Sequence, residues 1–269
     1  MNTAPYRPKK SLGQHFLHDG NIARKIVAEL DPQPGDHVVE IGPGPGMLTA
    51  LLAEHDMTLT AVEIDVRAVE DLRRRFPTER FPQVHVIHAD ILSWDIAAAH
   101  LPGAAPLRFI GNLPYNITSQ ILFRLFDSAD HITDAVLMMQ REVAERLTAK
   151  PGGKDYGILS VFTQLHGAVR RSFNVSPNVF TPRPAVWSSV VHLHLHPERL
   201  AHIQNYSFFR GIVKATFGQR RKTVANSLRH MGIDRDAMGS EAERYLTKRP
   251  EQLSVDDFII LSNSITAHD

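Results

Sequence analysis

The segment FIGNLPY, residues 109–115, ends an apolar stretch with an amide, a proline and an aromatic ring. Asn112 and the main chain of Leu113 offer two carbonyl oxygens. Two such acceptors around an adenine N6 amine favour tetrahedral nitrogen, which frees a lone pair otherwise delocalised into the ring. Pro114 restricts the backbone that aims the acceptors, and Tyr115 offers a flat face to a base taken out of its stack. These residues predict positioning and electrostatic catalysis.

Polar residues also end three earlier apolar segments. The first ends in Glu40 and opens the loop GPGPG, whose Gly42 and Gly44 let the backbone approach a ligand closely. Glu63 ends the second, about 20 residues after Gly44, where a ribose-binding carboxylate belongs. Asp90 ends the third and can accept the exocyclic amine of an adenine. Turn glycines and surface acids explain each feature singly, whereas the four ends together predict a nucleotide site.

Two classes of enzyme use such a nucleotide site. A nicotinamide-dependent dehydrogenase accounts for the glycine loop and Glu63, but it gives no reason for residues 112–115. A base-modifying methyltransferase accounts for them all. In that scheme the ring face of Tyr115 stacks on the base, and its hydroxyl has no role.

The elements that position these residues alternate from residue 36 onward. HVVEIG, LTAVEID, VHVIHAD, LRFIGN and DAVLMMQ are predicted strands, and GMLTALLAEH, VRAVEDLRRRF, TSQILFRLF and EVAERLTAK are predicted helices. This alternation predicts an α/β fold with a mostly parallel sheet, covered on both faces. Ligands of open α/β sheets bind outside the carboxyl ends of the strands, so the polar strand ends are expected to meet at one edge.

The pattern changes after the last of these helices. VRRSFNVSP and SSVVHLHLH are predicted strands joined by the proline-rich loop NVFTPRPAVW. His192, His194 and His196 alternate on the second of them and so share a face. Because no carboxylate cluster accompanies them in the sequence, a polar strand face is favoured over a metal site.

Only helices are predicted from Tyr206 onward, and Ser254 and Asp257 are spaced as a capping box. The sequence therefore predicts two domains. Residues 1–199 form the nucleotide-binding domain and residues 200–269 a small helical domain.

Composition narrows the setting. The 269 residues are 43% hydrophobic and include no cysteine, which excludes disulfides and suits a reducing cytoplasm. No apolar run approaches the roughly 20 residues of a membrane helix, and the N-terminus lacks the apolar stretch of a secretory signal. The net charge is only +1, but basic residues gather at Arg7, Lys9 and Lys10 and again at 210–229. Local basic patches on a neutral chain indicate phosphate binding.

Four segments of the chain resemble the ribosomal RNA adenine N6-dimethyltransferases: SLGQHFL, EIGPGPGMLT, NLPY and KATFGQRRKTVANSL. The last segment is similar to the bacterial family that dimethylates two adjacent adenines near the 3′ end of small-subunit (16S) RNA. The similarity covers nearly the whole chain. It implies a Rossmann-like methyltransferase sheet with a C-terminal helical domain, and S-adenosylmethionine as cofactor.

The resemblance also implies roles for single residues. His15 and Leu17 would border S-adenosylmethionine, although many family members have Asn at the position of His15. The other cofactor-binding residues would be Gly42, Gly44, Glu63 at the ribose, Asp90 at the adenine amine, and Asn112 between methyl donor and target. Phe180 would cover the target base opposite Tyr115. RNA would contact Arg220, Arg221 and Lys222.

The implied partner is 16S rRNA within a partly assembled small subunit, and the implied form is a cytoplasmic monomer with no membrane association. Two other functions stay open. A resistance-type 23S rRNA methyltransferase would share the site, although the late basic segment argues against it. A ribosome-assembly factor acting mainly by binding would not need the intact residues 112–115.

Overall fold

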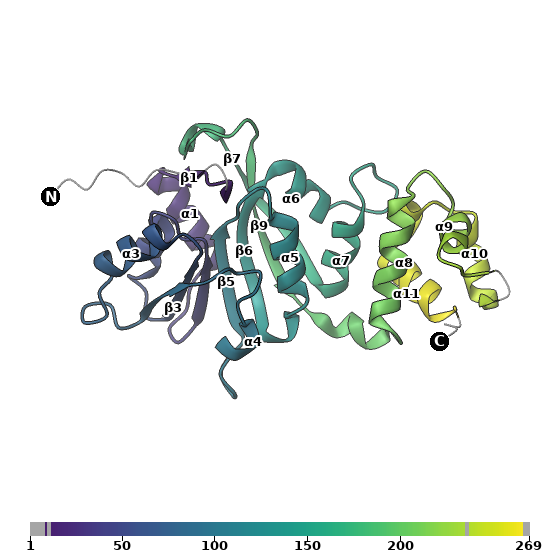
Figure 1. Ribbon diagram of the computed structural model, residues 1–269, viewed down its shortest axis with the longest axis horizontal. Coiled ribbons are helices and arrows are strands. Elements are labelled where there is room, and N and C mark those ends of the chain that lie inside the picture. The colour runs from purple at the N-terminus through teal and green to yellow at the C-terminus, as the bar shows by residue number, and fades with distance from the viewer. Residues whose placement is uncertain (1–8, 10–11, 235–236, 266–269) are drawn as a thin grey trace. The chain divides into compact units, whose positions relative to one another are not determined.

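The computed structural model describes residues 9, 12–234 and 237–265 (Figure 1). Arg7 and Lys10 of the predicted basic arm lie outside the described residues. The chain forms two compact units, one of residues 1–144 with 169–195, and one of residues 145–168 with 196–269.

Seven strands of the first unit form one sheet in the order β4-β3-β2-β5-β6-β9-β7. Strands β2 to β6 run parallel, and β9 is antiparallel to β6. A two-stranded antiparallel ribbon, β1 with β8, lies apart from this sheet. The strands are β1 (Phe16–Leu17), β2 (His37–Ile41), β3 (Thr58–Glu63), β4 (Val84–His88), β5 (Leu107–Asn112), β6 (Ile132–Gln140), β7 (Gly167–Val175), β8 (Phe180–Thr181) and β9 (Ser188–Leu195). This mixed sheet with interleaved helices is the predicted Rossmann-like fold.

The helices of this unit bury one apolar face each. They are α1 (Gly20–Leu30), α2 (Met47–Leu52), α3 (Val66–Arg75), α4 (Ile96–Ala99) and α5 (Thr118–Phe126), and α6 (Arg141–Leu147) follows β6 directly. Ile26 of α1, Leu52 of α2 and Leu72 of α3 join Val38 of β2 and Ile110 of β5 in one core cluster. Burial of such a side chain stabilises the fold by roughly 1.5–3 kcal/mol. The apolar strands are therefore held by helices, of which α2 and α3 were predicted from the alternating pattern and α1 was not.

The second unit is helical. Its α-helices are α7 (Ile158–His166), α8 (Tyr206–Gly218), α9 (Val224–His230), α10 (Glu243–Leu246) and α11 (Val255–Asn263). The predicted capping box at the start of α11 is confirmed, because Asp257 N donates to Ser254 Oγ at 3.1 Å and Ser254 N donates to Asp257 Oδ2 at 2.9 Å. Among the described residues no helix is long and apolar enough to cross a bilayer.

The predicted single boundary at residue 200 differs from this division. Residues 145–168 belong to the helical unit. The physical reason is the packing of α7, whose buried Phe162 meets Phe209 of α8 edge to face, with ring centroids 6.1 Å apart. The alternation of strands and helices gave no sign that α7 would pack on helices that follow it by some 40 residues.

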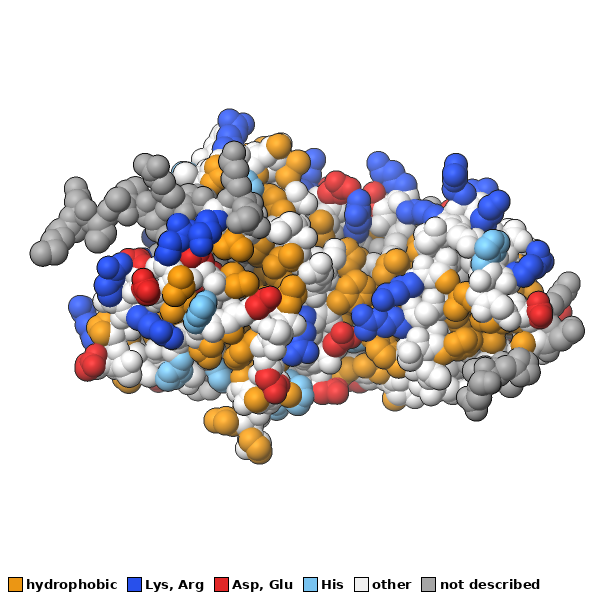
Figure 2. All heavy atoms as spheres, in the orientation of Figure 1, with side chains coloured by type: hydrophobic (Ala, Val, Ile, Leu, Met, Phe, Trp, Pro, Cys, Tyr) orange, Lys and Arg blue, Asp and Glu red, His pale blue; other side chains and the backbone are white. Residues whose placement is uncertain are grey.

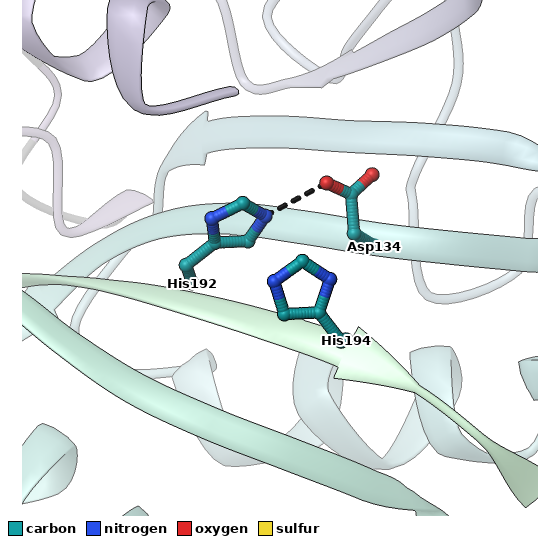
Figure 3. Close-up of side chains that lie close together, drawn as sticks. All are labelled: Asp134, His192 and His194. Atoms are coloured by element: carbon teal, nitrogen blue, oxygen red, sulfur yellow. Dashed lines mark hydrogen bonds and ion pairs between the residues drawn. The ribbon is translucent and has the colours of Figure 1, made fainter. Parts of the chain in front are cut away.

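The two strand histidines share a face, as predicted (Figure 3). However, the premise that no carboxylate accompanies them is wrong, because β6 and α1 supply two. His192 Nε2 lies 2.7 Å from Asp134 Oδ2, and its Nδ1 lies 3.1 Å from Glu29 Oε1. Both ring nitrogens of His192 therefore face carboxylate oxygens. His196 lies beyond the end of β9.

Arg108 of β5 completes this buried charge cluster. Its Nε and Nη2 each lie 2.8 Å from one oxygen of Asp134, and its Nη1 lies 2.7 Å from Asp36 Oδ2. Burial alone would raise the pKa of Asp134, but the hydrogen bonds from Arg108 and His192 outweigh burial and hold it below its usual value. The cluster therefore joins α1, β5, β6 and β9 at the edge of the sheet where the parallel strands begin.

Candidate active site at the carboxyl ends of the strands

A cavity of about 220 Å³ lies where β2, β3 and β5 end. Most of the residues predicted for the site line it: His15, Gly42, Gly44, Glu63, Asp90, Asn112, Leu113, Pro114 and Tyr115. The expectation that the polar strand ends meet at one edge is therefore confirmed, and the lining comes entirely from the first unit.

Glu63 is held from both sides by main-chain groups. Gly44 N donates to its Oε2 at 3.0 Å, and Asp65 N donates to its Oε1 at 2.8 Å. Gly44 has the left-handed φ of 52° that favours glycine, and an added Cβ would meet Phe16 at 3.0 Å. The two bonds fix the carboxylate at the cavity wall, while burial, the largest effect, raises its pKa. The predicted spacing of glycine and acid thus corresponds to a direct contact.

Asp90 and Gly42 form the neighbouring parts of the wall. Leu92 N donates to Asp90 Oδ1 at 2.9 Å, which orients a half-buried carboxylate in the cavity lining. Gly42 has a φ of 62°, and no atom lies within 4 Å of the place a Cβ would occupy. A ligand can therefore reach the backbone at the end of β2.

Asn112 is oriented by the segment that precedes the sheet. Its Nδ2 donates to the main-chain oxygen of His15 at 2.8 Å. A carbonyl accepts hydrogen bonds only, so the amide nitrogen faces His15 and Oδ1 takes the other direction. Within the part of the chain that the structure describes, no group donates to Oδ1. Asn112 therefore presents an unused acceptor at the cavity.

The main-chain carbonyls of Leu113 and Pro114 differ in whether their oxygens already accept hydrogen bonds. The Pro114 oxygen accepts from Ile117 N at 3.3 Å and from Thr118 Oγ1 at 2.9 Å. Leu113 N donates to Met138 O at 2.9 Å, which ties the turn to β6. The Leu113 oxygen accepts no bond from the residues described here. The two acceptors predicted from the sequence, Asn112 Oδ1 and the Leu113 carbonyl, are thus the ones left open.

Tyr115 is fixed at both its hydroxyl and its ring. The hydroxyl lies 2.7 Å from Oγ of Ser188, which is fully buried. The ring stacks on the His15 imidazole, with centroids 5.1 Å apart and planes inclined by 27°. His15 Nδ1 in turn donates to Pro182 O at 2.7 Å. The expectation that the Tyr115 hydroxyl has no role is therefore wrong as regards structure, since the hydroxyl anchors the ring.

Loss of this anchor is expected to slow the methyl transfer that the sequence resemblance implies. Burial raises the pKa of Tyr115, so its phenol stays protonated and bonded to Ser188 at neutral pH. We expect Tyr115→Phe and Ser188→Ala each to lower the rate about 10-fold, the worth of one hydrogen bond in a buried pair. Because the two changes remove one interaction, the double variant should be little slower than either. Initial rates of the four proteins test this, and additive losses would contradict it.

Two predicted residues do not join the cavity lining. Leu17 and Phe180 face each other in the β1–β8 ribbon and are only 6% and 3% exposed. Both belong to the core cluster, because the ribbon packs its apolar side chains onto the sheet unit. In this arrangement Phe180 presents no exposed ring to a base. The stacking of Phe180 on a base stays a prediction. The burial of its ring argues against that role.

The predicted RNA-binding residues lie in the turn between α8 and α9. Arg220 Nη2 donates to Gly153 O at 3.0 Å, and the side chain also faces Glu251 at 3.9 Å. Arg221 and Lys222 are exposed. Lys and Arg side chains recur over α8 and α9 in Figure 2. Within the described residues, Arg220 therefore makes side-chain contacts that Arg221 and Lys222 lack.

Glu40 is a buried acid beside the site whose properties the sequence did not reveal. It is 1% exposed, accepts from Thr49 Oγ1 at 2.6 Å, and lines a small cavity together with Asn112 and Gly42. Burial raises its pKa to about 7, with a further contribution from Glu63. Strand-end position was the only signal in the sequence, and it says nothing of burial depth.

Glu40 should make stability depend on pH. A folded-state pKa of about 7 against 4.5 means that the folded protein holds this proton more tightly. Stability is therefore expected to fall between pH 4.5 and pH 7, by about 3 kcal/mol in all. Glu40→Gln should remove this loss of stability. The variant should therefore unfold at a higher urea concentration than the parent at pH 8, but not at pH 4, and urea unfolding curves at both pH values measure the difference. Equal pH dependence in the two proteins would contradict the assignment.

Comparison with known proteins gives one consistent answer. The family model for ribosomal RNA adenine dimethylase matches residues 6–266. The "Ribosomal RNA small subunit methyltransferase A" of Salinibacter ruber is 45% identical over 98% of this chain and 87% of its own length. The protein of the same name from Prosthecochloris aestuarii is 43% identical over 96% and 94%.

Two solved structures of RNA-modifying enzymes resemble this chain over most of its length. A dimethyladenosine transferase from Plasmodium falciparum is 26% identical, with a TM-score of 0.76 over 92% of this chain and 96% of that one. The 23S rRNA methyltransferase ErmE is 25% identical, with a TM-score of 0.67 over 93% and 99%. The curated relatives carry small-subunit names, and the family match spans nearly the whole chain. This chain belongs to the ribosomal RNA adenine dimethylase family.

Proposed function

We propose that this rRNA adenine dimethyltransferase, which takes methyl groups from S-adenosylmethionine, modifies two adjacent adenines near the 3′ end of 16S rRNA. The observation that carries the proposal is the orientation of Asn112. With its amide nitrogen bonded to His15, its oxygen and the Leu113 carbonyl are two acceptors at the end of β5. A 23S target is disfavoured by the small-subunit names of the relatives, which are 40–45% identical.

The two acceptors act on the target amine. Before the first transfer they would hold the two N6 hydrogens of adenine, and before the second transfer one of them would hold the single hydrogen that remains; both favour tetrahedral nitrogen with its lone pair free. S-adenosylmethionine, when bound, would supply the methyl group as an electrophile on positively charged sulfur and leave as neutral S-adenosylhomocysteine, and the N6 proton would pass to solvent. Because the protein only orients and polarises the amine, no acid or base with a tuned pKa is required at Asn112. The Tyr115 ring stacks on the target base.

The cavity residues suit the donor. In the proposed arrangement Glu63 accepts from the ribose hydroxyls with the lone pairs that Gly44 N and Asp65 N leave free. Asp90 accepts from the adenine amine. Gly42 gives the ligand access to the end of β2, and His15 borders it. Leu17 supports this wall from the core, one residue beyond Phe16.

The proposed setting is a monomer acting on a partly assembled small subunit in the cytoplasm. The absence of cysteine suits a reducing compartment. RNA in a subunit is recognised mainly by its folded shape, so a partly assembled subunit should be methylated faster than naked 16S rRNA. Comparing the two rates tests this proposal, and equal rates would contradict it.

Arg221 and Lys222 are proposed to contact RNA phosphates. Replacing both by alanine should weaken binding to the subunit and reduce the salt dependence of that binding by about two charges. S-adenosylmethionine binding should not change. Arg220→Ala is the matched comparison, because its side chain already bonds within the helical unit. Binding to the subunit, measured from 50 to 200 mM salt, distinguishes these outcomes. If the salt dependence of binding is the same in the double variant as in the parent, Arg221 and Lys222 do not contact RNA.

A further inference from the structure

The loop between β8 and β9, residues 182–187, combines a buried and an exposed side. Pro182 accepts from His15 at one end of the loop, and Ser188, just past the other end, bonds Tyr115. Pro184 is buried between them. The backbone of the loop is therefore tied at both ends to the residues that surround the proposed target base.

The exposed side of the loop is apolar and basic. Trp187 is 47% exposed and Val186 43% exposed, which makes them two of the five exposed large hydrophobic residues among those described. Arg183 is exposed in the same loop. Single exposed apolar residues are ordinary, but here an indole, a second apolar side chain and an arginine are all exposed within residues 183–187 of one loop.

Strand register places this surface at the carboxyl edge of the sheet. Asn112 lies opposite Met138 of β6, and Met138 lies opposite Val190 of β9. Trp187 comes three residues before Val190, and its carbonyl accepts from Arg141 N at 2.9 Å, just past the end of β6. Two strand spacings and three residues put the Trp187 backbone roughly 10 Å across and roughly 10 Å beyond Asn112.

We propose that Trp187 is a stacking platform for the RNA nucleotide next to the target adenine, with Arg183 facing its phosphate. When one base leaves the stack and enters a pocket, its neighbour loses a stacking partner. An exposed aromatic ring replaces that partner whatever the base is, and an arginine beside it matches the backbone charge. The proposal rests on the proposed function, because it assigns the neighbour of the base held by Tyr115.

Kinetics of a variant series test this surface. Stacking on an aromatic side chain predicts a rise of about 5-fold to 100-fold in KM for the small subunit in Trp187→Ala. The kcat at saturating subunit and the affinity for S-adenosylmethionine should stay near the parent values. Trp187→Phe keeps an aromatic face and should recover most of the loss. Leu101→Ala, at a 65% exposed residue, is the matched control for exposure and should behave as the parent.

Fluorescence provides a second readout. The chain has two tryptophans, so a Trp94→Phe protein reports on Trp187 alone. Titration with a short single-stranded adenine oligoribonucleotide should quench its emission, whereas inorganic polyphosphate should not. Quenching by both would indicate charge alone and overturn the stacking role. If the parent methylates the subunit and Trp187→Ala has the same KM as the parent, the stacking role of Trp187 is overturned and the proposed function is not. If the parent does not methylate the subunit, the proposed function itself is overturned.

Discussion

Asn112→Ala is expected to lower methyl transfer by about 100-fold or more, while the fold and RNA binding stay close to those of the parent. Removing one preorganised polar contact to a transition state costs on that order in kcat. The change removes Oδ1 from the amine and leaves the His15 carbonyl without its donor. Because the lost contact is strongest when the amine becomes tetrahedral, kcat should fall more than KM rises.

Asn112→Asp is the informative companion to that variant. It keeps an oxygen toward the amine but replaces the Nδ2 donor with a second acceptor facing the His15 carbonyl. We expect it to lose activity because the orientation of the side chain is lost, although an acceptor remains. Rates with labelled methyl donor and a partly assembled subunit measure both variants. Full activity in Asn112→Asp would show that the His15 contact does not set the orientation.

Asp134→Ala is expected to destabilise the protein by about 3–5 kcal/mol, the cost of removing one partner from a buried ion pair. Asp134 is 2% exposed, and its loss would leave the Arg108 guanidinium without the carboxylate that it contacts through Nε and Nη2. Asp36→Ala removes the more exposed partner of Arg108 and should cost less. Denaturant unfolding at pH 7 compares the three proteins.

The pH dependence of the same pair has a defined sign. The pKa of Asp134 is lower in the folded protein than in the unfolded chain. Its contribution is therefore fully present above the unfolded value of 3.8 and is lost as pH falls through the folded value. The gap between parent and Asp134→Ala should narrow only in acid. A gap that is unchanged at low pH, or a cost below about 1 kcal/mol at pH 7, would contradict a buried charge cluster.

Predictions from the sequence were most accurate for features that depend on a local pattern of residues. Residues 118–126 were predicted as a helix and form α5, and Gly44 and Glu63 were paired by spacing and share a hydrogen bond. Both features depend on periodicity within one βαβ unit. The same reasoning selected the two open carbonyls at the end of β5, because it asked which acceptors an amine requires.

Contacts between distant segments were not predictable in this way. Ser188 and Tyr115 are 73 residues apart, and no local pattern pairs them. The stacking of His15 on Tyr115 depends on how the segment before the sheet lies across its edge. Phe180 matched a motif but is buried by its pairing with Leu17. The Glu40 pKa of about 7 follows from depth of burial, which a strand-end position does not specify.

We propose that two open carbonyls at the end of β5 drive two successive methylations of an adenine amine in small-subunit RNA. Mass spectrometry of a nuclease digest is the decisive experiment, after incubation of unmethylated, partly assembled subunits with the protein and S-adenosylmethionine. The predicted result is monomethyladenosine that rises and then falls as N6,N6-dimethyladenosine accumulates at two adjacent positions, with both products formed more slowly, by about 100-fold or more, by Asn112→Ala. Dimethyladenosine at parent levels from a folded Asn112→Ala protein, or methylation confined to another base, would contradict the account.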